Sequence, residues 1–157
     1  MDNMKIKVLV LDVDGTMTDG KVYIAENGEL FKGFNIKDGL GIHDILPRFN
    51  IVPVVITGRK SRILEIRCKE IGIEYLYQGI WNKESVLSYF LESNHFTFDE
   101  CAYIGDDIND IECMKLVAVV GCPADAVEAV KKVAHYVSRC NGGEGAVRDF
   151  IEWLCQK

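Results

Sequence analysis

The sequence predicts an α/β protein built on a doubly wound parallel sheet, and three observations lead to this fold class. Runs of Val, Ile and Leu such as 7–11 and 51–56 are too short and too β-branched for helices and are typical of strands buried on both faces. Segments with apolar residues at helical spacing lie between these runs. No repeat, low-complexity stretch or linker interrupts the 157 residues, which suffice for one domain with its own core.

The expected elements alternate along the chain. Strands are expected at 7–11, 51–56, 75–77, 102–104 and 117–120, with a minor strand at 136–137. Helices are expected at 40–46, ending near Pro47, at 61–71, from 82 or 83 to 91, after Asp110 to about 116, from a cap at 123–125 to about 133, and at 146–154. Strands that alternate with helices imply right-handed crossovers and helices on both faces of the sheet.

A hairpin interrupts this alternation near the N-terminus. Its strands, 21–25 and 29–34, join at Asn27-Gly28, a pair that favours tight turns with positive φ. The hairpin carries more apolar side chains than an isolated ribbon can leave in water, so we expect a flap at about 20–35 that packs on something, such as another subunit. The Gly-rich stretch 142–145 predicts a flexible loop within a flexible tail at about 140–157.

Composition excludes several classes of partner. A net charge of −6 without a stripe of Lys and Arg argues against nucleic acid as the main partner. No apolar stretch approaches the length of a transmembrane helix, and the residues before the first strand leave no room for a signal peptide. The six cysteines show no C-x-x-C spacing and resemble reduced core residues. We therefore expect a cytoplasmic protein with no membrane partner.

Polar side chains gather where the predicted strands end. Asp12 and Asp14 end the first strand, Thr57 follows the second, Lys83 lies on the loop after the third, and the acid-rich stretch 106–110 follows the fourth. Ligands of a doubly wound sheet bind outside the carboxyl ends of its strands. The sequence therefore predicts that these four stretches converge on one site.

The residue types at this edge suit phosphoryl transfer. Carboxylates are hard oxygen ligands that favour Mg²⁺. A threonine hydroxyl and a lysine ammonium can hold phosphate oxygens, while one carboxylate acts as nucleophile and the other as general acid and base. Taken singly, Thr57 also fits a helix cap, Lys83 a solvated lysine, and Asp107 and Asp110 acids that favour a helix N-terminus.

The four stretches 12–16, 57–59, Lys83 and 105–110 resemble the four motifs of the haloacid dehalogenase superfamily of phosphatases. The resemblance extends from residue 5 to the end of the chain, and it implies a single domain over 1–157 with a Rossmann-like fold. It also implies that Asp12 is the nucleophile and Asp14 the general acid and base.

The same resemblance implies a metal site and a phosphate site. Mg²⁺ would be bound by Asp12, the backbone carbonyl of Asp14, and Asp106. Thr57 and Lys83 would hold the phosphoryl group. Asp107 and Asp110 would orient the metal shell or Lys83.

The chain lacks room for a cap domain, because only the hairpin, short helices and a short strand separate Asp12, Thr57 and Lys83. Together with the stretches 34–42, 56–60, 77–79 and 142–148, this resembles the 3-deoxy-D-manno-octulosonate 8-phosphate phosphatases. Members of that family are tetramers in which the hairpin of one subunit covers a neighbour's site. The resemblance implies substrate contacts from Thr16, Gly58, Arg59, Arg67 and Arg148.

Three alternatives remain at this point. Asn109 resembles the branch that acts on nonulosonate 9-phosphates of the sialic acid type, whereas Arg59 resembles the octulosonate branch and lies nearer the substrate. A non-catalytic oligomerisation module that accompanies an acylneuraminate cytidylyltransferase is disfavoured, because all four motifs are retained. A response-regulator receiver domain is disfavoured because no acid ends the third predicted strand.

Overall fold

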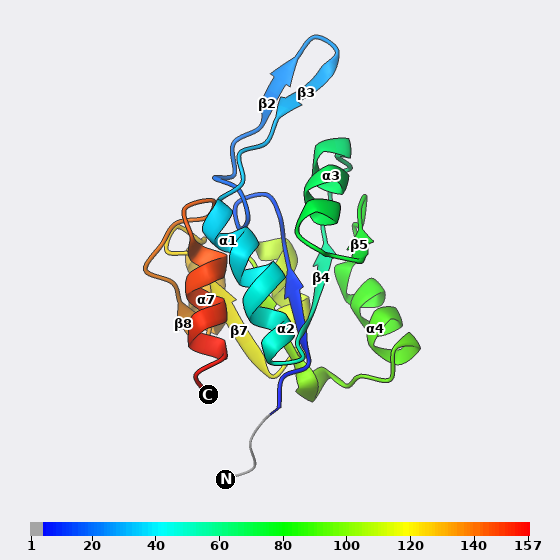
Figure 1. Ribbon diagram of the computed structural model, residues 1–157, viewed down its shortest axis with the longest axis vertical. Helices are drawn as coiled ribbons and strands as arrows, with labels where there is room; N and C mark the ends of the chain where they lie inside the picture. The colour runs from blue at the N-terminus through cyan, green and yellow to red at the C-terminus, as the bar shows by residue number, and fades with distance from the viewer. Residues whose placement is uncertain (1–4) are drawn as a thin grey trace.

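The computed structural model describes residues 5–157 and contains a six-stranded parallel sheet in the order β5-β4-β1-β6-β7-β8 (Figure 1). The strands are β1 Val8–Leu11, β4 Val52–Ile56, β5 Tyr75–Tyr77, β6 Cys101–Ile104, β7 Val119–Cys122 and β8 Tyr136–Val137. The chain adds β4 and β5 on one side of β1 and then crosses to add β6, β7 and β8 on the other. The strand order therefore reverses beside β1, which confirms the predicted doubly wound fold.

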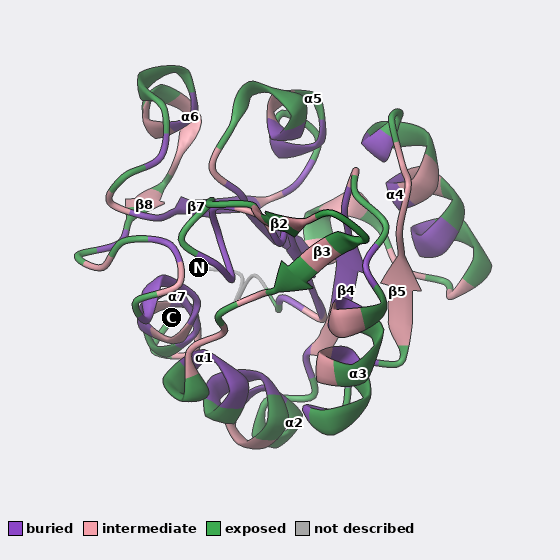
Figure 2. Cartoon of the chain, turned by 90° about the horizontal axis from the view of Figure 1, so that it is seen from above, coloured by how far each residue is buried: buried purple, intermediate pink, exposed green. Residues whose placement is uncertain are grey.

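Helices cover both faces of the sheet. The helical elements are α1 Ile36–Leu40, the π-helical η1 Gly41–Ile45, α2 Leu46–Arg48, α3 Arg62–Glu70, α4 Lys83–Ser93, the 3₁₀ turns η2 Phe98–Glu100 and η3 Ile108–Asp110, α5 Ile111–Met114, α6 Glu128–Val133 and α7 Ala146–Leu154. Helices α2, α3 and α7 lie on one face of the sheet, and α4, α5 and α6 lie on the other (Figure 2). Side chains of η1, α2, α3 and α7 belong to one core cluster, and those of α4, α5 and α6 belong to a second.

The first strand divides the core in two. Leu9 and Leu11 belong to the cluster under α3 and α7, whereas Val8 and Val10 belong to the cluster under α4 and α5. All four side chains are fully buried, and each contributes about 1.5–3 kcal/mol relative to exposure. A strand held on both faces is a rigid base for the residue that follows it, Asp12.

Two elements lie later in the chain than predicted. Strand β7 occupies 119–122 rather than 117–120. It includes Gly121, where the ring of Phe150 fills the space that a Cβ would need. Helix α6 begins at Glu128 rather than at 123–125, because the carboxylate of Asp125 accepts a bond from the backbone N–H of Gly142 at 2.9 Å. That carboxylate is therefore engaged by a distant loop.

The flap is a hairpin of β2 Tyr23–Ala25 and β3 Gly28–Phe31, shorter than predicted, and it projects from the body (Figure 1). The rings of Tyr23 and Phe31 stack with centroids 4.3 Å apart. Ile24 and Leu30 are 69% and 59% exposed. The flap thus leaves in water the apolar surface that the sequence analysis expected to need a partner.

The C-terminal segment is packed in this structure, in contrast to the expected flexible tail. A Cβ on Gly142 would lie 1.9 Å from the backbone oxygen of Gly15, so this loop is wedged against the turn after β1. Helix α7 buries Phe150 and Ile151 on the sheet. Glycine at this position permits two backbone segments to approach closely. From composition alone, a glycine that serves this purpose looks the same as a glycine in a mobile loop.

Two further expectations concern cysteines and membranes. All six cysteines are free, and Cys68, Cys101, Cys113 and Cys122 are buried. Within residues 5–157, no helix is both long enough and apolar enough to cross a bilayer.

Candidate active site

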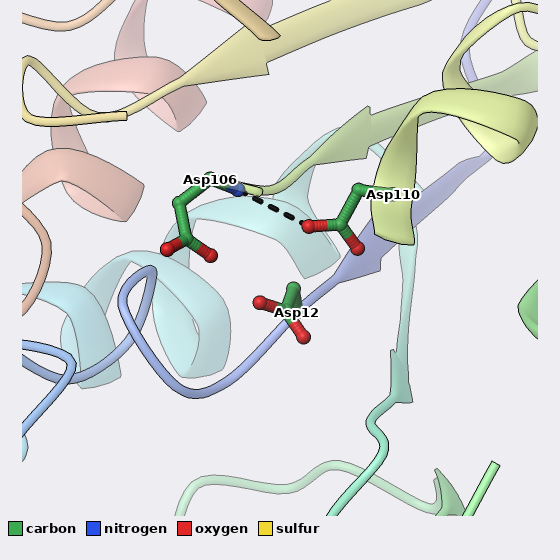
Figure 3. Close-up of side chains that lie close together, drawn as sticks. All are labelled: Asp12, Asp106 and Asp110. Atoms are coloured by element: carbon green, nitrogen blue, oxygen red, sulfur yellow. Dashed lines mark hydrogen bonds between the residues drawn. The ribbon is translucent and has the colours of Figure 1, made fainter. Parts of the chain in front are cut away.

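Three carboxylates meet at the carboxyl end of the sheet (Figure 3). Asp12 follows β1, Asp106 follows β6, and Asp110 ends the 3₁₀ turn after it. One oxygen from each lies within 4.8 Å of the others. Asp12 and Asp110 are 5% and 0% exposed, so this concentration of charge lies away from water.

Lys83 joins two of these acids. Its Nζ donates to Oδ1 of Asp12 and to Oδ1 of Asp110, each at 2.8 Å. The side chain of Asn82 caps α4 by accepting from the N–H of Ser85, and this places Lys83 in the first turn. Burial opposes protonation of Lys83, but the two carboxylates outweigh it and raise the lysine pKa above its ordinary value.

Asp110 is occupied by the protein's own donors. Besides Lys83, its Oδ1 accepts from the hydroxyl of Tyr103 at 2.6 Å. Its Oδ2 accepts from the backbone N–H groups of Asp106 and Asp107 at 3.2 and 3.4 Å. Tyr103 was missed by the sequence analysis, although the hydroxyl of a tyrosine in a buried strand usually has a hydrogen-bond partner. Asp110 thus orients Lys83 and the 106–107 turn.

The remaining oxygens of Asp12 and Asp106 suit a cation. Burial, followed by repulsion from Asp110, raises the pKa of Asp12 well above its ordinary value despite Lys83. Burial also raises the pKa of Asp106 to about 6, and Asp110 adds to the effect. Thr16 Oγ1 donates to Oδ1 of Asp106 at 3.2 Å. A divalent cation between these carboxylates would relieve the repulsion, so the residues present fit the Mg²⁺ that the sequence analysis expects.

A pH-dependent stability follows from Asp106. Its folded pKa of about 6 exceeds the ordinary 3.8, so without a cation the protein loses stability as the pH rises from about 4 to about 6. We expect Asp106→Asn to raise the metal-free melting temperature at pH 7 and to flatten this pH dependence. Mg²⁺ at a concentration of 100 times its Kd should raise the unfolding free energy of the parent by about 2.7 kcal/mol, and we expect the variant to lose this stabilisation. Calorimetry with and without Mg²⁺ measures both effects. A metal-free variant less stable than the parent at pH 7 would contradict the prediction.

Asp14, Thr57, Gly58 and Arg59 follow β1 and β4, the paired parallel strands that end at the same edge of the sheet. Asp14 turns its side chain toward the flap, where Lys32 Nζ donates to its Oδ1 at 2.7 Å. The Arg59 guanidinium lies 4.0 Å from Asp14 and is about half exposed. Thr57 is buried at the end of β4, and its carbonyl accepts from the N–H of Ile80. Gly58 also lies next to Ile80, since a Cβ on Gly58 would be 3.7 Å from the backbone oxygen of Ile80.

The remaining predicted residues take other positions. Asp107 caps η3 by accepting from the N–H of Ile108. Arg67 pairs with Glu70 at 3.0 Å, and Arg148 pairs with Glu152 at 2.6 Å. Among the described residues, neither arginine makes a hydrogen bond or ion pair with the three clustered acids.

Both arginines instead flank a buried acid that the sequence analysis did not single out, Asp38. Its Oδ1 accepts from the backbone N–H of Arg148 at 2.9 Å, and its side chain is buried beside Arg67. Burial raises the pKa of Asp38 to about 6, although both arginines oppose the rise. Asp38 therefore joins α1, at the foot of the flap, to the first turn of α7.

Comparisons with known proteins agree with this fold. The profile of the haloacid dehalogenase-like hydrolase family matches residues 57–151. A 3-deoxy-D-manno-octulosonate 8-phosphate phosphatase of Escherichia coli strain K12 is 42% identical over 149 residues, which are 95% of this chain and 79% of the relative.

Solved structures extend the likeness to three dimensions. The phosphatase of the same name from Moraxella catarrhalis, in complex with a magnesium ion, a phosphate ion and a KDO molecule, is 32% identical with a TM-score of 0.92, over 98% of this chain and 88% of that one. The cobalt-bound phosphatase from Haemophilus influenzae is 35% identical with a TM-score of 0.93, over 98% and 89% of the two chains.

The fold, the clustered acids and these similarities define the class of protein: the chain belongs to the haloacid dehalogenase-like hydrolases. Within them, the relatives that it matches over nearly its whole length include the 3-deoxy-D-manno-octulosonate 8-phosphate phosphatases.

Proposed function

We propose that this chain is a Mg²⁺-dependent phosphomonoesterase that hydrolyses 3-deoxy-D-manno-octulosonate 8-phosphate to the free sugar acid and inorganic phosphate. The observation that carries the proposal is the buried Asp12 at the end of β1, 2.8 Å from Lys83 and clustered with Asp106. The 42% identity to phosphatases of that name supports the substrate. Six free thiols support a reducing, cytoplasmic setting.

In the first half of the reaction, a carboxylate oxygen of Asp12 attacks phosphorus and forms an aspartyl phosphate. The bond from phosphorus to the sugar oxygen breaks, and Asp14 gives that oxygen its proton. In the second half, Asp14 takes a proton from the attacking water, the bond from phosphorus to Asp12 breaks, and inorganic phosphate leaves. Asp12 and Asp14 are thereby restored.

Other side chains hold charge during these steps. Lys83 and Thr57 bind the phosphoryl oxygens, with Thr16 and Gly58 beside them. Asp12, the backbone carbonyl of Asp14, and Asp106 would hold Mg²⁺. When bound, the metal supplies positive charge next to the phosphoryl group. The excess of buried carboxylates over Lys83 supports this assignment.

A substrate panel tests the proposal. The panel contains 3-deoxy-D-manno-octulosonate 8-phosphate, a nonulosonate 9-phosphate and simple sugar phosphates, and phosphate release gives kcat/KM for each with Mg²⁺ and with excess chelator. We expect the octulosonate ester to give the highest value and chelation to abolish it. A preference for the nonulosonate ester would favour that branch, and no hydrolysis with Mg²⁺ would favour a non-catalytic module.

We further propose that the protein works as a homo-oligomer, most simply a tetramer. The exposed apolar side chains of the flap, among them Phe31 at 48%, support the proposal. In such an assembly the flap would cover a neighbouring site, and Arg59, Arg67 and Arg148 could meet the carboxylate or hydroxyls of the sugar acid.

Phe31→Glu should therefore lower the oligomer mass and the specific activity together. A charge there disrupts an apolar contact in which each fully buried side chain is worth about 1.5–3 kcal/mol. Phe49→Glu, which changes an exposed aromatic outside the flap, is the matched control. Light scattering and phosphate release on the same sample measure both quantities. A monomeric Phe31→Glu protein with undiminished kcat/KM would refute the coupling.

A further inference from the structure

A lysine of the flap reaches the loop that carries the catalytic acids. Lys32 directly follows β3, and its side chain is only 5% exposed although the hairpin projects from the body. Its Nζ lies 2.7 Å from Oδ1 of Asp14 and 3.2 Å from Oε2 of Glu29. A buried ammonium is costly unless carboxylates compensate it, and these two do so. Lys32 therefore belongs to the polar site rather than to the apolar surface of the flap.

Further contacts hold this part of the flap in place. Oε1 of Glu29 accepts from the hydroxyl of Ser61, the residue that caps α3, at 2.5 Å. The Arg59 guanidinium lies 3.9 Å from Glu29 and 4.0 Å from Asp14. Glu29 and Lys32 of the flap thus form ion pairs with Asp14 and Arg59, which follow β1 and β4 in the same chain.

We propose that Lys32 is a positioning residue for Asp14, and this inference rests on the role of Asp14 in the proposed function. When Asp14 gives its proton to the leaving sugar oxygen, a negative charge appears on its carboxylate. The ammonium 2.7 Å away holds that carboxylate in one orientation and stabilises the charge as it forms. The flap of each chain thereby supports proton transfer in that chain's own site, whatever it covers in a neighbour.

The proposal distinguishes substrates by their leaving groups. An alkoxide leaves only if it is protonated, whereas p-nitrophenolate leaves without a proton. The value of kcat/KM reports the steps up to the formation of the aspartyl phosphate, so the later attack by water does not obscure the comparison. Loss of the Lys32 ammonium should therefore lower kcat/KM far more for sugar phosphates than for p-nitrophenyl phosphate.

The experiment compares Lys32→Met, Lys32→Arg and the control Lys21→Met, an exposed lysine in the segment of the flap that leads into β2. We expect Lys32→Met to lower kcat/KM for the sugar phosphate by about 10- to 100-fold, and that for p-nitrophenyl phosphate by less than about twofold. Lys32→Arg, which keeps the charge, should recover most of the loss. Lys21→Met should match the parent with both substrates.

Equal losses with both substrates would overturn the inference, because they would indicate a structural or phosphate-binding role; light scattering on the same samples shows whether such losses follow the oligomer mass. Unchanged values with both substrates would overturn it as well. Failure of the proposed function is separately visible, because the parent would then not hydrolyse the octulosonate ester. In that case, the sugar phosphate that the parent hydrolyses fastest replaces the octulosonate ester in the comparison with p-nitrophenyl phosphate.

Discussion

Asp12→Asn should lower kcat by at least about 10⁴-fold, the scale seen when a catalytic nucleophile is removed. The amide is a poor nucleophile and cannot form the aspartyl phosphate. We expect the fold to persist, because the amide is nearly isosteric and Lys83 keeps its 2.8 Å contact with Asp110. Since burial raises the pKa of Asp12, removing the charge should leave the metal-free melting temperature unchanged or higher.

Steady-state phosphate release on protein whose mass excludes deamidation measures this effect. Asp99→Asn, which neutralises an exposed acid outside the site, is the matched control and should retain full activity. Turnover of the verified Asp12→Asn protein within 100-fold of the parent would contradict the assignment of the nucleophile.

Lys83→Met should lower both activity and stability. The loss of the cation that we propose binds the phosphoryl oxygens should reduce kcat by about 10²–10³-fold. The substitution also leaves the buried carboxylates of Asp12 and Asp110 without their shared partner. Breaking a buried pair by removing one member typically costs about 3–5 kcal/mol.

The pH dependence of this loss has a definite sign. The raised pKa of Lys83 means that its stabilisation is present at neutral pH and is lost only as the pH rises past the ordinary lysine value. In Lys83→Met, Asp12 faces Asp110 without the ammonium between them. Because burial and Asp110 hold the pKa of Asp12 well above its ordinary value, Asp12 takes up a proton as the pH falls from 7 to 5, and this relieves the repulsion. The difference in unfolding free energy from the parent should therefore shrink on acidification.

Chemical denaturation at pH 7 and pH 5, both without metal, measures that difference. Lys115→Met is the control, because its pair with Glu112 is exposed at the surface and is worth at most about 1 kcal/mol. A Lys83→Met protein as stable as the parent at pH 7 would show that Lys83 does not hold the acids together.

The sequence by itself determined the sheet and the edge where the polar groups meet. Val8 to Leu11 are apolar at every position, and such a short, β-branched run is typical of a strand with both faces covered. Parallel strands bring their carboxyl ends to one edge, so Asp12, Thr57 and Asp106 had to lie together once the strands were recognised. Local pattern and a general rule of topology were sufficient for this part.

Only the tertiary structure decided which partner each of these side chains takes. The sequence shows several acids but not that Lys83 and Tyr103 share Asp110, that Lys32 turns to Asp14, or that Asp125 binds the loop at Gly142. It also does not show that Arg67 and Arg148 flank Asp38. A strand or helix follows from neighbours a few residues apart, whereas an ion pair depends on atoms that lie within about 3 Å only after distant segments have packed.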